Sequence, residues 1–163
     1  MLQELVLIHK LIYHHFYLYQ IKKGDFSTLG IFSATSVMDY RQDIIKKHED
    51  TIYERELLFA NYLKTVGFNA EPVLITYPKN KDIEAIISKE SSKTPEYHFT
   101  TPDKKSHQLW RIKDPATILS LQQAFSSIDK LYIADGHHRS ASSSLLANDL
   151  SKGNQQMLAD EPY

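Results

Sequence analysis

Alternating apolar and polar positions along the chain predict two β-hairpins. They pair residues 15–22 with 27–36, and residues 97–101 with 107–113. The first run is rich in aromatic and β-branched residues, and Lys23-Gly24-Asp25 supplies the turn that reverses it. In the second hairpin, the alternation places Trp110 and Ile112 on the face opposite to Leu109 and Arg111.

Apolar residues at spacings of three and four predict helices in the remaining segments. Such a pattern over residues 37–48 predicts one helix, with Lys46 and Lys47 suited to its negative C-terminal end. Thr51 and Glu54 have the spacing of a capping box, which favours a second helix directly after them. Further helices are expected over residues 52–66, 82–89 and 140–150, and from Pro115 onward.

Two short apolar runs, residues 72–77 and 131–134, are expected to be buried strands. Strands that alternate with helices indicate the α/β class, here a mixed sheet with flanking helices. The length suits one domain over residues 1–163. Residues 1–13 are expected to form a short helix or strand that covers this domain. Residues 160–163 supply no closing element, so the fold is expected to be incomplete at both ends.

The composition narrows the function classes. A formal charge of −1 provides no basic field, so nucleic acid is not expected as a partner. The absence of cysteine excludes disulfides, thiolate metal sites and cysteine nucleophiles, and it fits a cytoplasmic protein. His9 and Lys10 interrupt the apolar N-terminal run, so we expect no membrane span.

The sequence LYIADGHHR, residues 131–139, concentrates most of the candidate chemistry. It predicts a strand that ends on Asp135, a turn at Gly136, and a helix whose first residues carry nitrogen donors. A helix N-terminus offers free N–H groups and the positive end of its dipole, so it binds anions. Cationic side chains are disfavoured there unless an anion lies between them. We therefore assign phosphate binding to Gly136, His137, His138, Arg139 and Ser140.

Two other interpretations of this turn remain open. In the first, Asp135 only caps the helix and the histidines are polar surface residues. In the second, Asp135, His137 and His138 bind a metal, although adjacent histidines diverge on a helix. Mg²⁺ held through substrate phosphates and the Asp135 carboxylate stays compatible with the pattern. His48-Glu49 begins like a zinc-binding H-E-x-x-H motif, but Ile52 occupies the place of the second histidine.

Glu49 is the best candidate for a general base. It lies at a predicted junction between helices, beside His48 and after Lys46 and Lys47, whose positive charge would keep a carboxylate ionised. Simple solvation is the alternative, since that is the usual environment of a glutamate. The chain has no Walker A, G-x-G-x-x-G or G-x-S-x-G sequence, so the common nucleotide-binding loops and the serine-hydrolase motif are excluded.

Four blocks of the sequence resemble the bacterial proteins grouped as domain of unknown function 1015. The blocks are DYRQDIIKKHEDT (39–51), EPVLITYP (71–78), LWRIKDP (109–115) and LYIADGHHRSAS (131–142). Members of that family are longer, so this chain resembles an internal portion of them.

The D-G-H-H-R turn is also similar to the phosphate-binding turn of the ParB and sulfiredoxin superfamily, which includes the free serine kinases. This resemblance implies a ParB/sulfiredoxin-like α/β fold in which the Gly136-to-Arg139 segment contacts phosphate. It also implies that Asp135 orients the substrate or a metal and that Glu49 is the base for the serine hydroxyl. Sulfiredoxin activity needs a cysteine in the turn, and none is present.

These observations together predict phosphoryl transfer on a phosphorylated small molecule, with serine or phosphoserine as the substrate. Glu49, Asp135 and His137 are the expected catalytic residues, and ATP, ADP or pyrophosphate is the expected donor. Two alternatives stay open: a non-enzymatic module that binds a nucleotide or phosphate, and an inactive truncated fragment. The sequence does not determine the oligomeric state.

Overall fold

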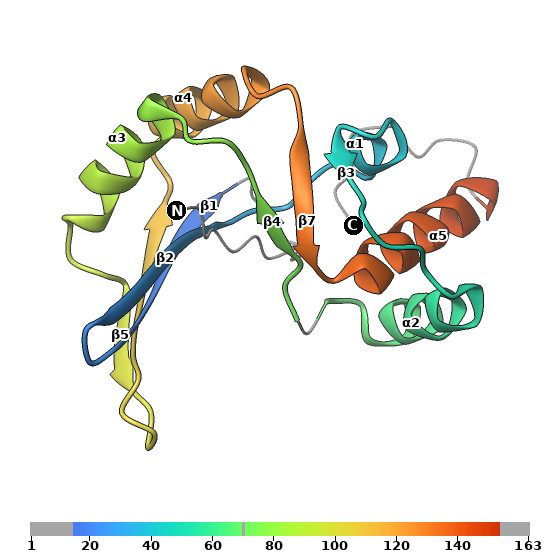
Figure 1. The fold of residues 1–163 in the computed structure, drawn as a ribbon, viewed down its shortest axis with the longest axis horizontal. Helices are drawn as coiled ribbons and strands as arrows, with labels where there is room; N and C mark the ends of the chain where they lie inside the picture. The colour runs from blue at the N-terminus through green and yellow to red at the C-terminus, as the bar shows by residue number, and fades with distance from the viewer. Residues whose placement is uncertain (1–14, 70, 154–163) are drawn as a thin grey trace.

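The computed structural model describes residues 15–69 and 71–153, which form five helices and two sheets (Figure 1). The strands are β1 (Phe16–Lys23), β2 (Phe26–Phe32), β3 (Ile45–Lys46), β4 (Leu74–Thr76), β5 (Tyr97–Thr100), β6 (Ser106–Ile112) and β7 (Leu131–Asp135). The helices are α1 (Val37–Arg41), α2 (Tyr53–Val66), α3 (Lys81–Ser91), α4 (Pro115–Ser126) and α5 (His137–Gly153). The expected α/β class is therefore confirmed.

Both predicted hairpins are present and join into one antiparallel sheet of order β2-β1-β6-β5. The pairing of β1 with β6, in which Leu18 lies opposite Trp110, links the two hairpins. The first hairpin ends earlier than predicted, because β2 stops at Phe32.

Helices α3 and α4 pack on one face of this sheet and form the largest core (Figure 1). Leu18, Trp110 and Ile112 project from the strands, and Ile83 and Leu121 meet them from the helices. All five side chains are at most 6% exposed, which confirms that Trp110 and Ile112 share one face of β6 and shows that this face is the buried one.

The second sheet has the order β3-β7-β4, with β3 parallel and β4 antiparallel to β7. Its core consists of Ile45, Val73, Ile75 and Ile133. A single mixed sheet is expected from the sequence, whereas the structure divides the strands between two sheets and only this smaller one is mixed. The hairpin strands bury their apolar face under α3 and α4, so they do not pair with β7.

The helix predicted over residues 37–48 is wrong in its second half. Helix α1 ends at Arg41, and Asp43 adopts a left-handed backbone conformation with φ of 59°. Ile45 then continues as β3, because its side chain is buried in the core of the small sheet. Lys46 and Lys47 therefore follow a strand and do not lie at a helix end.

Helix α2 is confirmed, but its predicted capping box is wrong. Ile52 is the N-cap and provides no side-chain acceptor, and the Thr51 hydroxyl donates to Glu56, not to Glu54. Gly67 ends the helix in a left-handed conformation, with φ of 81°. The junction that contains Glu49 thus connects a strand to a helix.

Helix α5 begins at His137, three residues before the predicted start, and packs on α2 through Leu146, Ala60 and Leu63. The predictions for residues 1–13 and 160–163 lie outside the described residues. Within residues 15–69 and 71–153, no helix is both long and apolar enough to cross a membrane.

The Asn80 cap of α3 gives a stability prediction. Its side-chain oxygen accepts hydrogen bonds from the backbone N–H groups of Asp82 and Ile83, at 3.0 and 3.1 Å. Asn80→Ala leaves these donors without the side-chain acceptor, so we expect the free energy of unfolding in urea to fall by about 1 kcal/mol. Asn80→Ser keeps an acceptor and is the matched control. Equal losses in both variants would contradict a capping role.

Candidate functional site

The candidate site lies at the end of β7, where the segment that follows β3 reaches the start of α5. Strand β3 is parallel to β7 and pairs with its first two residues, so the chain leaves β3 in the direction of the carboxyl end of β7, a common position for ligand sites. The segment after β3 carries His48 and Glu49, and α5 begins directly after β7 with His137. Residues 48 and 137 are 89 positions apart in sequence, yet they are in contact.

His48, Glu49 and His137 form a compact cluster. The backbone N–H of His48 donates to Nε2 of His137 at 3.5 Å, and the two imidazole rings meet edge to face with centroids 4.3 Å apart. Nδ1 of His137 lies 3.7 Å from Oε2 of Glu49. Nε2 of His48 lies 3.5 Å from Oε1 of the same carboxylate. The structure thus brings together three of the residues that the sequence analysis selects.

Burial keeps His137 neutral. The residue is only 5% exposed, and this burial, followed by the nearby His48, lowers the pKa of its imidazole. Glu49 and Asp135 act in the opposite direction without reversing the shift. A backbone N–H can only donate, so this arrangement favours a neutral ring that accepts at Nε2 and carries its proton on Nδ1, the nitrogen that faces Glu49.

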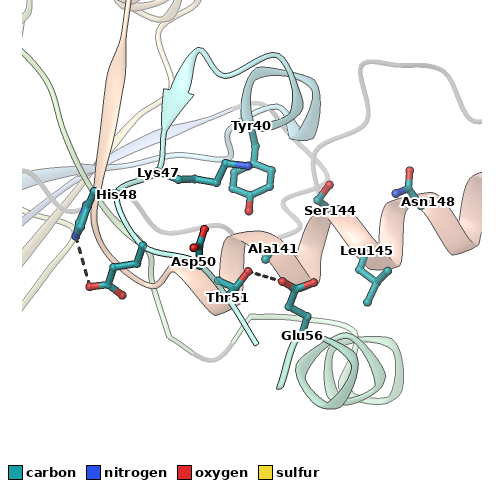
Figure 2. A pocket seen from close by; sticks show the side chains of 11 residues that line it. Tyr40, Lys47, His48, Asp50, Thr51, Glu56, Ala141, Ser144, Leu145 and Asn148 are labelled. Atoms are coloured by element: carbon teal, nitrogen blue, oxygen red, sulfur yellow. Dashed lines mark hydrogen bonds and ion pairs between the residues drawn. The ribbon is translucent and has the colours of Figure 1, made fainter. Parts of the chain in front are cut away.

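An open pocket of about 540 Å³ adjoins this cluster (Figure 2). Its walls come from α1, the segment after β3, the start of α2, and one face of α5. The lining residues are Tyr40, Lys47, His48, Glu49, Asp50, Thr51, Glu56, Ala141, Ser144, Leu145 and Asn148. Three of the sequence-predicted residues, Lys47, His48 and Glu49, therefore lie in the pocket wall.

The pocket carries more negative than positive charge. Among the described residues of its lining, Glu49, Asp50 and Glu56 contribute carboxylates, whereas Lys47 is the single lysine or arginine. The Lys47 ammonium lies 4.6 Å from the centroid of the Tyr40 ring, whose hydroxyl is directed toward α5 (Figure 2). Burial, followed by the charge of Glu56, raises the pKa of Tyr40.

The residues of α5 that line the pocket lie at helical spacings from His137. Ala141, Ser144 and Asn148 lie four, seven and eleven residues later, so all share one helical face with it. Arg41 anchors this face, donating from Nε to the Ser144 hydroxyl at 3.1 Å and from Nη2 to its carbonyl at 2.8 Å. The sequence analysis missed Ser144 and Asn148, although their spacing from His137 was a usable signal.

The sequence analysis also missed four other residues of the pocket lining, for a different reason: Tyr40, Asp50, Thr51 and Glu56. They become neighbours of α5 through long-range contacts, which are the pairing of β3 with β7, the packing of α2 on α5 and the Arg41–Ser144 hydrogen bonds, and no local pattern encodes these contacts.

Gly136 allows the sharp turn between β7 and α5. Its φ is 98°, a value that side-chain-bearing residues rarely adopt. A Cβ there would lie 3.2 Å from the Arg139 guanidinium carbon and 3.2 Å from Cγ2 of Val73. The glycine is therefore required both by its backbone conformation and by its close neighbours.

Arg139 is directed away from the pocket. Its Nη2 lies 2.6 Å from Oδ2 of Asp135, its Nη1 donates to the carbonyl of Pro72, and Glu71 lies 3.6 Å from that nitrogen. The guanidinium thus connects the β7–α5 turn to the chain before β4. The Asp135 carboxylate, a predicted catalytic and metal-binding group, is engaged in this ion pair.

The other predicted residues also lie outside the pocket lining. Lys46 forms an ion pair with Asp43. Ser140 lines a separate small cavity of about 20 Å³ beside α1 and β3. Nδ1 of His138 is buried and has no hydrogen-bond partner among the described residues.

Gly136→Ala tests whether the turn between β7 and α5 requires a glycine. Forcing this backbone conformation on alanine costs about 1–3 kcal/mol, and the contacts at 3.2 Å add to it, so we expect a loss in that range or above. Gly67→Ala is the matched control, because Gly67 also has positive φ but has nothing within 4 Å of the added Cβ. Chemical denaturation measures both variants. A loss no larger than that of Gly67→Ala would show that crowding at Gly136 has no effect.

Arg139→Ala tests whether the hydrogen bond from Arg139 to the Pro72 carbonyl stabilises the fold. It leaves a carbonyl and a carboxylate without their donor, so we expect a loss of about 1–3 kcal/mol in the free energy of unfolding. Arg111→Ala is the control, because it removes the partly exposed ion pair between Arg111 of β6 and Glu96. Its free energy of unfolding is expected to fall by at most about 1 kcal/mol. Unchanged stability in Arg139→Ala would argue against this structural role.

Comparison with known proteins adds a family assignment. No curated protein matches the chain, and no solved structure matches it. One family model, described as Protein of unknown function (DUF1015), matches residues 1–163. The match spans the turn, the Glu49 segment and the α5 wall alike, and the chain therefore belongs to this family.

Proposed function

We propose that this chain transfers a phosphoryl group between a phosphate donor and the hydroxyl of a small molecule, and that Glu49 is the base. One observation carries the proposal. Glu49 lies in the wall of an open pocket and is held beside a buried histidine at the N-terminus of α5. Serine or phosphoserine is the substrate that we propose, with ATP, ADP or pyrophosphate as the partner in the transfer.

The phosphate end of the site is the start of α5. The first backbone N–H groups of a helix have no intrahelical acceptor, and the helix dipole places positive charge there. Gly136 permits the sharp turn that brings these N–H groups to the end of β7, beside the segment that carries Glu49. Lys47 supplies a further positive charge from the pocket wall.

Glu49 accepts the proton of the attacking hydroxyl. The hydroxyl oxygen forms a new bond to phosphorus as the bond to the leaving phosphate breaks, and the leaving group keeps the electron pair. Catalysis of this reaction consists of positioning and charge stabilisation. The Glu49 side chain is 64% exposed, so a substrate in the pocket can reach it.

His137 is a positioning residue in this scheme. Its Nε2 faces the His48 N–H, which directs the Nδ1 proton toward Glu49. His137 Nδ1 thus faces Oε2 of the carboxylate, while His48 Nε2 lies 3.5 Å from Oε1, so the two imidazoles together orient Glu49.

Mg²⁺ fits the acidic side of the pocket. Asp50 and Glu56 line the same pocket as Glu49, and Mg²⁺ prefers oxygen ligands shared with substrate phosphates. Such an ion would also offset the repulsion between a polyphosphate and these carboxylates.

The resemblance of the D-G-H-H-R turn to the ParB and sulfiredoxin superfamily supports the same reaction class. A phosphorylated small molecule is the only partner that we propose. The absence of cysteine supports a cytoplasmic location.

Glu49→Gln is the decisive variant. It removes the proton acceptor but keeps the shape of the side chain, so we expect turnover to fall by at least about 100-fold. Affinity for pyrophosphate is expected to stay within about twofold, because the phosphate contacts lie at α5. Phosphorus NMR of mixtures with Mg²⁺, L-serine and each of the three donors follows product formation, and calorimetry gives the affinity.

Glu54→Gln is the matched control, because Glu54 lies outside the pocket lining and is expected to retain full turnover. Absence of phosphoserine with all three donors would overturn phosphoryl transfer. Pyrophosphate binding without any turnover would instead indicate a non-enzymatic phosphate-binding module.

A further inference from the structure

The cluster of His48, Glu49 and His137 has the composition of a transition-metal site. Two imidazoles and one carboxylate, with open positions left for water or substrate, are the protein ligands of many catalytic zinc centres. One ligand atom from each residue lies within 4.8 Å of the other two. We propose that these three side chains bind a divalent transition-metal ion, for which Zn²⁺ is the probe.

The distances are close to those of a bound ion. Ligand atoms about 2.0–2.1 Å from a tetrahedral zinc ion lie roughly 3.3 Å from one another. Glu49 Oε1 lies 3.5 Å from His48 Nε2, and Oε2 of the same carboxylate lies 3.7 Å from His137 Nδ1. With one ligand atom from each residue, all separations are within 4.8 Å, so they must shorten by at most about 1.5 Å to reach the tetrahedral value.

The cluster combines one fixed ligand with two adjustable ones. His137 is 5% exposed and belongs to the first turn of α5, so its ring is held by the fold. The side chains of His48 and Glu49 are 57% and 64% exposed and line the pocket. They can rotate toward an ion without disturbing a core, while the pocket leaves space for the remaining ligands.

Metal binding requires one local change. An ion on Nδ1 of His137 moves the ring proton to Nε2, so the 3.5 Å contact from the His48 N–H must open. That contact is longer than the usual range for a hydrogen bond, and its loss costs little. Imidazole ligands favour Zn²⁺ and Co²⁺ over Mg²⁺, so the cluster differs in preference from the carboxylates deeper in the pocket.

The metal site shares Glu49 and His137 with the proposed reaction, but it is inferred from the side-chain cluster and does not rest on that reaction. A Glu49 carboxylate that coordinates an ion cannot accept a proton, so bound Zn²⁺ is expected to inhibit phosphoryl transfer. Direct binding measurements need no substrate, and the metal site can therefore be tested even if the proposed reaction is wrong.

The test is calorimetric titration of the whole chain with zinc chloride, supported by the visible spectrum of the Co²⁺ form. We expect about one ion per chain and intense tetrahedral cobalt bands. Removal of a residue that only hydrogen-bonds to a metal ligand lowers metal affinity by about 10–100-fold. His48 and Glu49 are proposed as direct ligands, so His48→Gln and Glu49→Gln are each expected to weaken zinc binding by at least that factor. Both side chains are exposed, so neither change is expected to unfold the protein.

His98→Gln is the matched control, because His98 lies on the exposed strand β5 in the other sheet. It is expected to leave zinc affinity unchanged. Zinc affinity that is equal in wild type, His48→Gln and Glu49→Gln would overturn the proposal, as would an equal loss in His98→Gln. A site filled by Mg²⁺ as tightly as by Zn²⁺ would also overturn it.

Discussion

The short parallel pairing of β3 with β7 is the constraint on which the candidate site depends. It consists of two residue pairs, Ile45 with Leu131 and Lys46 with Tyr132. Burial of Ile45 against Ile133 holds the strands together, because their apolar side chains share one small core. The pairing directs the segment after β3 toward the start of α5, where Glu49 lies beside His137.

The two sheets differ in the size of the apolar core that each one supports. The four-stranded sheet, with α3 and α4, buries most of the large apolar side chains. The small sheet has a core of four buried residues and supports the turn, the pocket and α5. The four-stranded sheet with α3 and α4 thus provides a well-packed scaffold, and the small sheet carries an open, polar pocket. Ligand sites are common on irregular segments that a rigid scaffold positions in this way.

The charges at the start of α5 are balanced differently from the sequence-based expectation. Three consecutive nitrogen donors at a helix N-terminus indicated a bound anion. In the structure, Asp135 and Glu71 lie against Arg139, and Glu49 lies against His137. The protein thus supplies negative charge of its own, and the case for phosphate rests on the free helical N–H groups, the pocket and the Glu49–His137 arrangement.

Local patterns predicted the elements well where a turn or cap marked them. Gly24 reverses the first hairpin, Asn80 and Asp114 cap α3 and α4, and Gly67 ends α2. The pattern failed over residues 37–48, where helical spacing continued past the true end of α1. A buried position in a strand and a buried position in a helix look alike in a short apolar run, and tertiary packing decided between them.

By itself, the amino-acid sequence determined the α/β class, the hairpins, most helices, and the turn that begins α5. It also selected Glu49, because its residue type and neighbours suited a general base, and His137, because it lies in the turn at a predicted helix N-terminus. Only the tertiary structure decided that these two residues meet, that Arg139 is directed away from the pocket, and that Ser144 and Asn148 form its wall. The physical reason is that periodicity and capping act over a few residues, whereas these contacts join segments up to 103 positions apart.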